Sequence, residues 1–240
     1  MGFRDENGTL VNEDLRYIRS VHYVLGVAQV FRKLKGRLAV EGFYKDYSQY
    51  PFIFPEQISL ANLGSDFEVI GNRLATSTNS GRAYGVEFSY EQKLYKGFYG
   101  IGALTLVRSE FEGNVYGGAT GNEIIGTELI PSSWDNRVVV SVTAGKKFGK
   151  NWEVSGRYRF LGKTPYAPTD TAATLVNYPA VIKDYSRLGS VLLDPFSQLD
   201  IRIDKKWDFK KWNLDLFFDI QNALAQQQPS EPSFGLDRDE

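Results

Sequence analysis

The feature that most constrains this chain is a strict two-residue alternation of apolar and polar side chains. It is clearest between residues 81 and 95, and it returns at 152–160, 199–209 and 212–220. Successive side chains of a β-strand point to opposite faces of the sheet, so this period predicts strands and not helices. Weaker alternation of the same kind covers 17–31, 34–50, 99–111 and 137–148. We therefore expect an all-β protein with eight strands.

The links between these strands are of two kinds, which follow each other in strict alternation. Short links lie at 32–33, 96–98, 149–151 and 210–211, where Gly, Asn and Lys provide the residues of tight hairpin turns. Long links lie at 51–80, 112–135 and 162–196, and long loops without structure of their own are uncommon unless they serve a function. All short turns should therefore emerge at one end of an up-and-down antiparallel sheet, as in outer-membrane β-barrels.

Aromatic side chains gather where a membrane interface would need them. The chain has 16 Phe, 14 Tyr and 4 Trp among 240 residues. Residues that flank the short turns predict one interfacial girdle: Tyr95, Phe98, Tyr99, Phe148, Trp152, Trp207, Phe209 and Trp212. A second belt is expected toward the long links, from Tyr44, Tyr47, Phe111, Tyr158 and Phe160. The alternative is a soluble β-sandwich, which predicts two facing sheets that bury their apolar faces together.

The polar face of the predicted strands is densely charged, whereas the apolar face is nearly free of charge through its middle. Charged side chains left dry and unpaired would cost several kcal/mol each, so they require water, partners or a polar plug. A wide hydrated bore suits them better than a closed eight-stranded barrel filled with side chains. The expected bore-facing charges are Glu87, Glu91, Arg157, Arg159, Asp200, Arg202, Asp204, Asp215 and Asp219.

Composition excludes several functions. The formal charge is -1, so a nucleic-acid partner is not expected. There is no Cys and one His, which removes thiol catalysis and thiolate or multi-histidine metal sites. His22 is best explained as a polar-face residue, and carboxylate pairs such as Glu87 with Glu91 are more typical of a hydrated bore than of a glycosidase. We expect no catalytic residue, no metal and no cofactor; an outer-membrane hydrolase would need His22 close to a Ser and an acidic residue.

Several stretches resemble one family, the TonB-dependent outer-membrane receptors, and most closely those of Bacteroidetes type. They are Gly81-Arg82-Ala83-Tyr84-Gly85-Val86-Glu87, Pro131-Ser132-Ser133-Trp134-Asp135-Asn136-Arg137, Phe160-Leu161-Gly162-Lys163-Thr164-Pro165-Tyr166-Ala167-Pro168, Asp219-Ile220-Gln221-Asn222-Ala223-Leu224 and the opening Asn12-Glu13-Asp14-Leu15-Arg16-Tyr17 through Tyr23. The likeness runs from about residue 5 to residue 238, and the order and spacing of the motifs are more specific than any one of them.

This resemblance implies a partial transmembrane β-barrel, about eight strands of a larger 22-stranded barrel in the bacterial outer membrane. It implies active uptake of a scarce nutrient, such as a ferric siderophore, cobalamin, a glycan or a peptide. The expected partners are outer-membrane lipid, the nutrient ligand and the TonB-ExbB-ExbD complex, with a surface lipoprotein left open. The chain departs from the family pattern because it shows no signal peptide, plug domain or TonB box. We therefore expect residues 1–240 to be the C-terminal part of the barrel domain, without its plug.

Ligand contacts are expected from the long loops and the bore wall. Tyr166, Tyr178 and Tyr185 lie in the third long link, and rigid aromatic surfaces grip sugars, chelates or peptides well. The alternative is that these rings pack the loops against one another. Four arginines assigned to the bore face are expected either to attract an anionic cargo or to pair with the plug: Arg108, Arg157, Arg159 and Arg202.

The sequence thus predicts a receptor that is not an enzyme. The main alternative is a complete small outer-membrane barrel that serves as an adhesin or structural anchor. That alternative requires the first strand to pair with the eighth.

Overall fold

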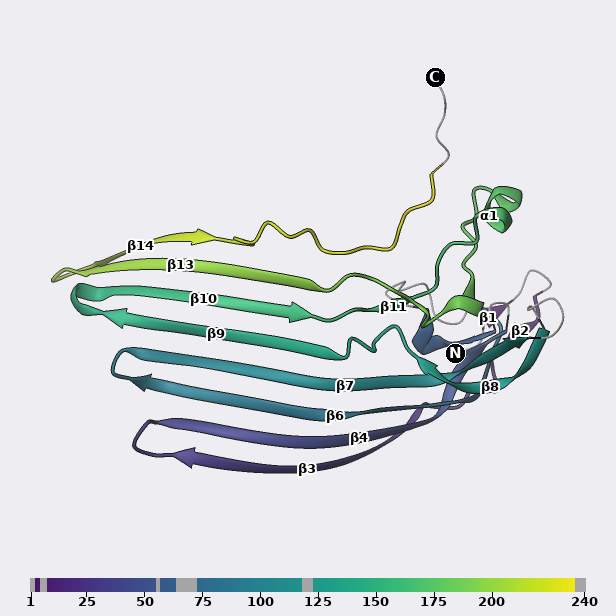
Figure 1. The fold of residues 1–240 in the computed structure, drawn as a ribbon, viewed down its shortest axis with the longest axis horizontal. Coiled ribbons are helices and arrows are strands. Elements are labelled where there is room, and N and C mark those ends of the chain that lie inside the picture. Colours follow the sequence, from purple (N-terminus) through teal and green to yellow (C-terminus); the bar gives the residue numbers. More distant parts are fainter. Residues whose placement is uncertain (1–2, 5–7, 55–56, 64–72, 118–122, 236–240) are drawn as a thin grey trace, which may run out of the picture.

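The computed structural model describes residues 3–4, 8–54, 57–63, 73–117 and 123–235, and it is dominated by one curved antiparallel sheet (Figure 1). The eight predicted strands are confirmed. They are β3 (Arg19–Phe31), β4 (Gly36–Ile53), β6 (Ala75–Tyr95), β7 (Phe98–Gly117), β9 (Val138–Phe148), β10 (Trp152–Leu161), β13 (Phe196–Asp208) and β14 (Asn213–Ile220). They lie in the order β14-β13-β10-β9-β7-β6-β4-β3, so neighbours in sequence are neighbours in the sheet.

The short links form tight turns that gather at one end of the sheet (Figure 1). Lys96 and Gly97 have φ values of 50° and 85°, and Lys150 and Asn151 have 60° and 58°. The link at 96–97 is a two-residue hairpin, and two consecutive residues with positive φ match the right-handed twist of its flanking strands. The link at 149–151 has three residues, of which the last two have positive φ. The predicted turn chemistry is therefore confirmed at these two links.

The long links carry more regular structure than their composition suggests, and the expectation of unstructured loops is wrong in part. β7 extends to Gly117 and pairs with β8 (Glu123–Pro131), so the link at 112–135 is largely a hairpin. The remaining short elements are β1 (Phe3–Arg4), β2 (Leu10–Val11), β5 (Ile58–Ser59), β11 (Pro165–Tyr166), β12 (Val191–Leu192), α1 (Thr171–Asn177) and the 3₁₀ turns η1 (Leu60–Asn62), η2 (Gly149–Asn151) and η3 (Tyr185–Arg187). No helix among the described residues is long and apolar enough to cross a membrane.

The register separates an apolar face from a charged face across the whole sheet. Directly opposed residues share a face, and one face carries Tyr44, Tyr84, Val86, Phe88, Leu104, Leu106, Val140, Val142, Val154, Tyr158, Leu199, Ile201, Ile203, Leu216 and Phe218. Val86 is 36% exposed and Ile203 is 39% exposed, because no second sheet formed by the described residues covers this face. The soluble sandwich is therefore wrong. An exposed apolar face of this extent marks a contact surface for a membrane or another protein, and the aromatic residues at the turn end favour the membrane.

The opposite face carries the charges that were assigned to the bore. Arg157 lies opposite Asp200, Arg202 lies opposite Asp219, and Glu41 lies opposite Glu87. We call this the bore face and the other the lipid face. The register places all nine predicted charged residues together on this face.

The predicted second aromatic belt is wrong for two of its members. Tyr47 and Phe111 both lie opposite Gly81 and face the bore, where their rings are 5.5 Å apart. Tyr99 of the turn girdle also faces the bore and donates a hydrogen bond to Glu153. Distance along a strand predicts how deep a ring lies in the membrane, but only the two-residue alternation decides whether it points to lipid or to the bore. The predicted belt used the distance alone.

β3 and β14 lie at opposite edges of the sheet and do not pair with each other. The closure that a complete small barrel requires is thus absent from the described residues. Among the described residues, no strand pairs with the outer backbone N–H and C=O groups of β3 and β14.

Candidate ligand-binding site

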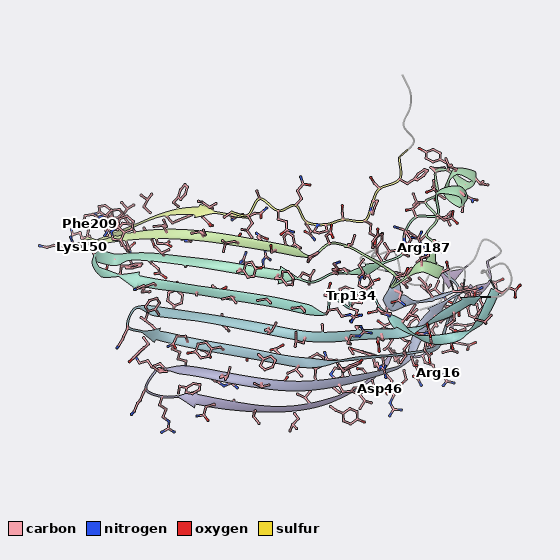
Figure 2. All side chains as sticks on the ribbon, in the orientation of Figure 1. Arg16, Asp46, Trp134, Lys150, Arg187 and Phe209 are labelled. Atoms are coloured by element: carbon pink, nitrogen blue, oxygen red, sulfur yellow. The ribbon has the colours of Figure 1, made fainter. Side chains whose placement is uncertain are left out.

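A pocket of about 560 Å³ lies at the loop end of the sheet, above β9, β10 and β13. Its wall is built from four segments that are distant in sequence, around residues 133–136, 161–166, 193–196 and 228–231. Trp134 contributes the largest ring and is 56% exposed. Figure 2 shows Trp134 toward the loop end, far from Lys150 and Phe209 at the turn end. The pocket volume lies within the range of small-molecule sites.

Backbone hydrogen bonds hold these segments together. The Gly162 N–H donates to the Val138 carbonyl at 2.8 Å, and the Leu193 N–H donates to the Thr164 carbonyl at 2.9 Å. A Cβ atom on Gly162 would lie 2.2 Å from the Asn136 carbonyl oxygen, so only glycine permits this close approach. The loop that carries Trp134 is thereby fixed against the chain that carries Tyr166.

The described residues that line the pocket combine aromatic rings with hydrogen-bonding groups and include no basic side chain. Trp134, Tyr166 and Phe196 supply rings, while Asn136, Asp194, Gln228 and Glu231 supply polar groups. Such a mixture suits a ligand with apolar faces and several hydroxyl or amide groups.

The three tyrosines predicted as ligand contacts occupy different positions. Tyr166 lies in β11 and lines the large pocket as well as a neighbouring one of about 270 Å³. Tyr178 is the residue after α1 and is exposed, and Tyr185 begins η3. The structure therefore brings Tyr166 into a pocket wall, whereas Tyr178 and Tyr185 lie outside both of these pockets.

Three of the four predicted arginines lie on the bore face, where two are ion-paired and the third is hydrogen-bonded to a neutral amide. Arg157 donates to the Asp200 carboxylate at 3.0 and 3.2 Å, and Arg202 forms an ion pair of 2.7 Å with Asp204. Arg159 donates to the Gln198 side-chain oxygen at 2.6 Å. The carboxylates therefore offset the charges of Arg157 and Arg202, whereas Gln198 leaves the charge of Arg159 uncompensated.

The placement of Arg108 in the bore is wrong. Arg108 lies opposite Tyr84, which puts it on the lipid face, beyond the apolar band toward the loops. It forms a 2.6 Å ion pair with Glu110, whose other carboxylate oxygen accepts a 2.9 Å hydrogen bond from Arg82. On β7 the odd-numbered residues Val107 and Ser109 face the bore, whereas the even-numbered Arg108 does not. The prediction followed the charge of the side chain and not the two-residue alternation along the strand.

Asp135 anchors the loop that carries Trp134. Its fully buried carboxylate accepts a hydrogen bond from the Ser109 N–H at 2.9 Å and one from Arg137 Nε at 2.7 Å. Burial raises the pKa of this carboxyl. Since the loop lies between β8 and β9, Asp135 is a positioning residue for the pocket.

His22 lies beside a serine and a lysine on the bore face. Its Nε2 lies 2.6 Å from the Ser20 hydroxyl oxygen, and Lys45 lies directly opposite on β4. Within the described part of the chain, no carboxylate hydrogen-bonds to His22, so the acidic partner that a hydrolase requires is missing there. The same residues contain no group of three or more potential metal ligands.

Sequence reasoning missed Trp134 as a site residue. Three of the four tryptophans flank the short turns, and Trp134 is the exception, in a long link. A tryptophan in a long link, away from the predicted girdle, was the sequence feature that could have indicated a binding role for Trp134. Its pocket partners could not be found this way, because Phe196 and Gln228 come close only through the fold.

Comparisons with known proteins agree with this architecture. A family model described as TonB dependent receptor-like, beta-barrel, matches residues 2–223. The ferripyoverdine receptor of the Pseudomonas aeruginosa outer membrane, solved with ferripyoverdine bound, aligns with a TM-score of 0.56 and 13% identity over 93% of this chain and 25% of its own. The Escherichia coli outer membrane transporter YddB aligns with a TM-score of 0.53 and 12% identity over 90% of this chain and 30% of its own. No curated protein matches.

At these identities the two structures show the fold alone, and the chain spans between a quarter and a third of their length. The family model, by contrast, covers most of the sequence, with the motifs that suggested the family lying almost wholly inside it. The chain belongs to the TonB-dependent receptor β-barrel family and is a protein of the bacterial outer membrane.

Proposed function

We propose that this chain is the C-terminal part of a receptor barrel that imports a scarce nutrient across the outer membrane. The observation that supports the proposal is the pocket lined by Trp134 and Tyr166. It lies at the loop end of a sheet that has one apolar face and one charged face. Since long loops of outer-membrane barrels face the cell exterior, the pocket would meet a nutrient that arrives from outside. A ferric siderophore, cobalamin, a glycan and a peptide remain the candidate ligands.

Uptake requires an energy source, and TonB-ExbB-ExbD is the proposed partner through a plug domain outside residues 1–240. The charged bore face is consistent with a polar plug inside the barrel, because ionised groups such as Glu87 and Asp219 need polar contacts or water. A surface lipoprotein is a further proposed partner. The exposed apolar residues Leu175 and Val176 of α1 support it, since they project from the loop end without a covering segment among the described residues.

The same proposal assigns no chemical reaction to the chain. Two observations support this: His22 hydrogen-bonds to Ser20 and to no carboxylate among the described residues, and the two aligned structures are a receptor and a transporter. The ligand should therefore be recovered chemically unchanged after binding.

The test substitutes the pocket rings in the full receptor. Trp134→Ala with Tyr166→Ala should weaken ligand binding by at least about tenfold, because buried aromatic contacts dominate binding energy. Trp212→Ala, at the turn end, is the matched control and should leave affinity unchanged. Equal affinity in the pocket variant and the wild type would remove this site from the proposal.

A further inference from the structure

The turn end of the sheet is strongly basic although the chain as a whole is nearly neutral. The residues of the turns at 32–35, 96–97, 149–151 and 209–212 include Arg or Lys in every case and no acidic residue. With a formal charge of -1 over the whole chain, the positive charge is concentrated at this end. Two more lysines, Lys146 and Lys205, lie just inside these turns on β9 and β13.

Lys146 and Lys205 face the lipid side of the sheet. Lys146 lies opposite Phe98 and Val154, and Lys205 lies opposite Trp152 and Leu216. These neighbours continue the apolar face defined above. Their sequence neighbours Lys147 and Lys206 face the bore instead, because adjacent residues of a strand point to opposite faces.

Each of the two ammonium groups is held against aromatic rings. Lys146 Nζ lies 4.2 Å from the ring centroid of Phe98 and 5.1 Å from that of Phe148. Lys205 Nζ lies 5.4 Å from the ring centroid of Trp152 and 5.1 Å from that of Trp207. Rings on both sides restrict the side chains and orient the ammonium groups at the edge of the apolar face.

The lipid-facing lysines differ from the bore-facing ones in their partners. Lys147 pairs with Glu153 at 3.6 Å, and Lys206 pairs with Asp208 at 3.7 Å. In the part of the chain that the structure describes, Lys146 and Lys205 have no carboxylate partner. Lys205 donates to the backbone carbonyl of Lys150, which leaves two of its three N–H groups available.

A charged ammonium on the lipid face must reach the headgroup layer, because the hydrocarbon core cannot solvate it. The aromatic belt places the membrane interface at the same level. Short turns of outer-membrane barrels face the periplasm, where the leaflet consists of phospholipids with anionic phosphate groups. The unpaired positive charges therefore lie where negative charges are fixed in the bilayer.

We propose that Lys146 and Lys205, with the rings around them, form a binding site for the headgroups of anionic phospholipids in the periplasmic leaflet. The site selects such lipids for the first shell around the barrel and fixes the depth of the turn end. It is independent of the nutrient pocket and of uptake.

The test uses the full receptor, purified in detergent, with retained lipid counted by native mass spectrometry against phosphatidylglycerol or phosphatidylcholine. The wild type should retain phosphatidylglycerol preferentially. A lysine near an anionic surface contributes about 1 kcal/mol, so Lys146→Gln or Lys205→Gln alone should reduce the preference about fivefold and the double variant more. The matched control is Lys147→Gln with Lys206→Gln, which removes the same charge at the same depth on the bore face.

The control should keep the preference, and Lys146→Arg with Lys205→Arg should keep most of it. Retained preference in the lipid-facing double variant, or equal loss in the control, would overturn the proposal. Displacement of phosphatidylglycerol by excess inorganic phosphate would also overturn it, since a free anion would then be the ligand. If the double variant does not fold, the two single variants decide the question.

Discussion

The ring of Phe111 on β7 covers Gly81 on β6, its directly opposed neighbour. A Cβ atom on Gly81 would lie 2.3 Å from Cδ1 of this ring. Phe111 is 4% exposed, and its ring is 4.7 Å from that of Tyr50. Together with Tyr47, these rings form an aromatic cluster on the bore face, and it packs the loop ends of β4, β6 and β7 together.

Gly81→Ala should therefore destabilise the loop end. Forcing a methyl group into a packed ring costs roughly 1–3 kcal/mol. The matched control is Gly126→Ala, because a Cβ on Gly126 meets nothing within 4 Å. Thermal or urea unfolding of the receptor in detergent measures both, and equal stability of the two variants would show that Phe111 moves aside without cost.

The ion-pair network above the apolar band makes stability at the loop end depend on pH. Burial raises the pKa of Glu110, but hydrogen bonds from Arg108 and Arg82 outweigh it, so the net pKa lies below the ordinary value of 4.5. A depressed carboxyl pKa stabilises the fold above the ordinary value, and this contribution is lost as the pH falls from about 4.5 through the lowered value. Glu110→Gln should remove this loss of stability at acidic pH, which is measured as the free energy of unfolding against pH. The same loss of stability below pH 4.5 in the variant and the wild type would show that Glu110 is not its source.

Asp135 offers a test of how the pocket is held. Asp135→Asn removes the charge that binds Arg137 and weakens the acceptor of the Ser109 N–H, which should cost roughly 1–3 kcal/mol at a buried site. Because the loop carries Trp134, ligand affinity should fall although no ligand contact is removed. Arg137→Gln, which keeps the Ser109 bond, should have a smaller effect on both stability and affinity. If Asp135→Asn and Arg137→Gln lost the same stability and ligand affinity, the hydrogen bond from the Ser109 N–H to Asp135 would contribute little.

The open edges of the sheet predict the behaviour of residues 1–240 expressed alone. Backbone groups without partners on β3 and β14 cannot face lipid and invite pairing with other chains. The isolated chain should aggregate or need the rest of its barrel. A monodisperse soluble monomer with a cooperative melt, measured by light scattering and circular dichroism, would be the opposite result.

Much of the fold was predictable because a strand repeats every two residues. All eight main strands, the turn end and the nine charged bore residues follow from parity within segments such as 81–95. The faces of Arg108, Tyr47 and Phe111 were predicted wrongly, because the two-residue alternation was not followed along their own strands. The pocket could not be predicted, since it depends on backbone approaches such as that of Gly162 to Asn136, which no local pattern encodes.

The proposed membrane orientation puts the apolar face of the sheet in contact with lipid and the charged face in contact with water. Since the chain has no cysteine, single cysteines can be introduced at Val86, Tyr158 and Ile201 on one face and at Glu87, Arg157 and Asp200 on the other. A fluorescent label at each site in the membrane-embedded receptor is then quenched by lipid-soluble or aqueous quenchers. The lipid-soluble quencher should act on the first three sites and the aqueous quencher on the last three. Aqueous quenching at Val86, Tyr158 and Ile201, or no difference between the two sets, would contradict the account.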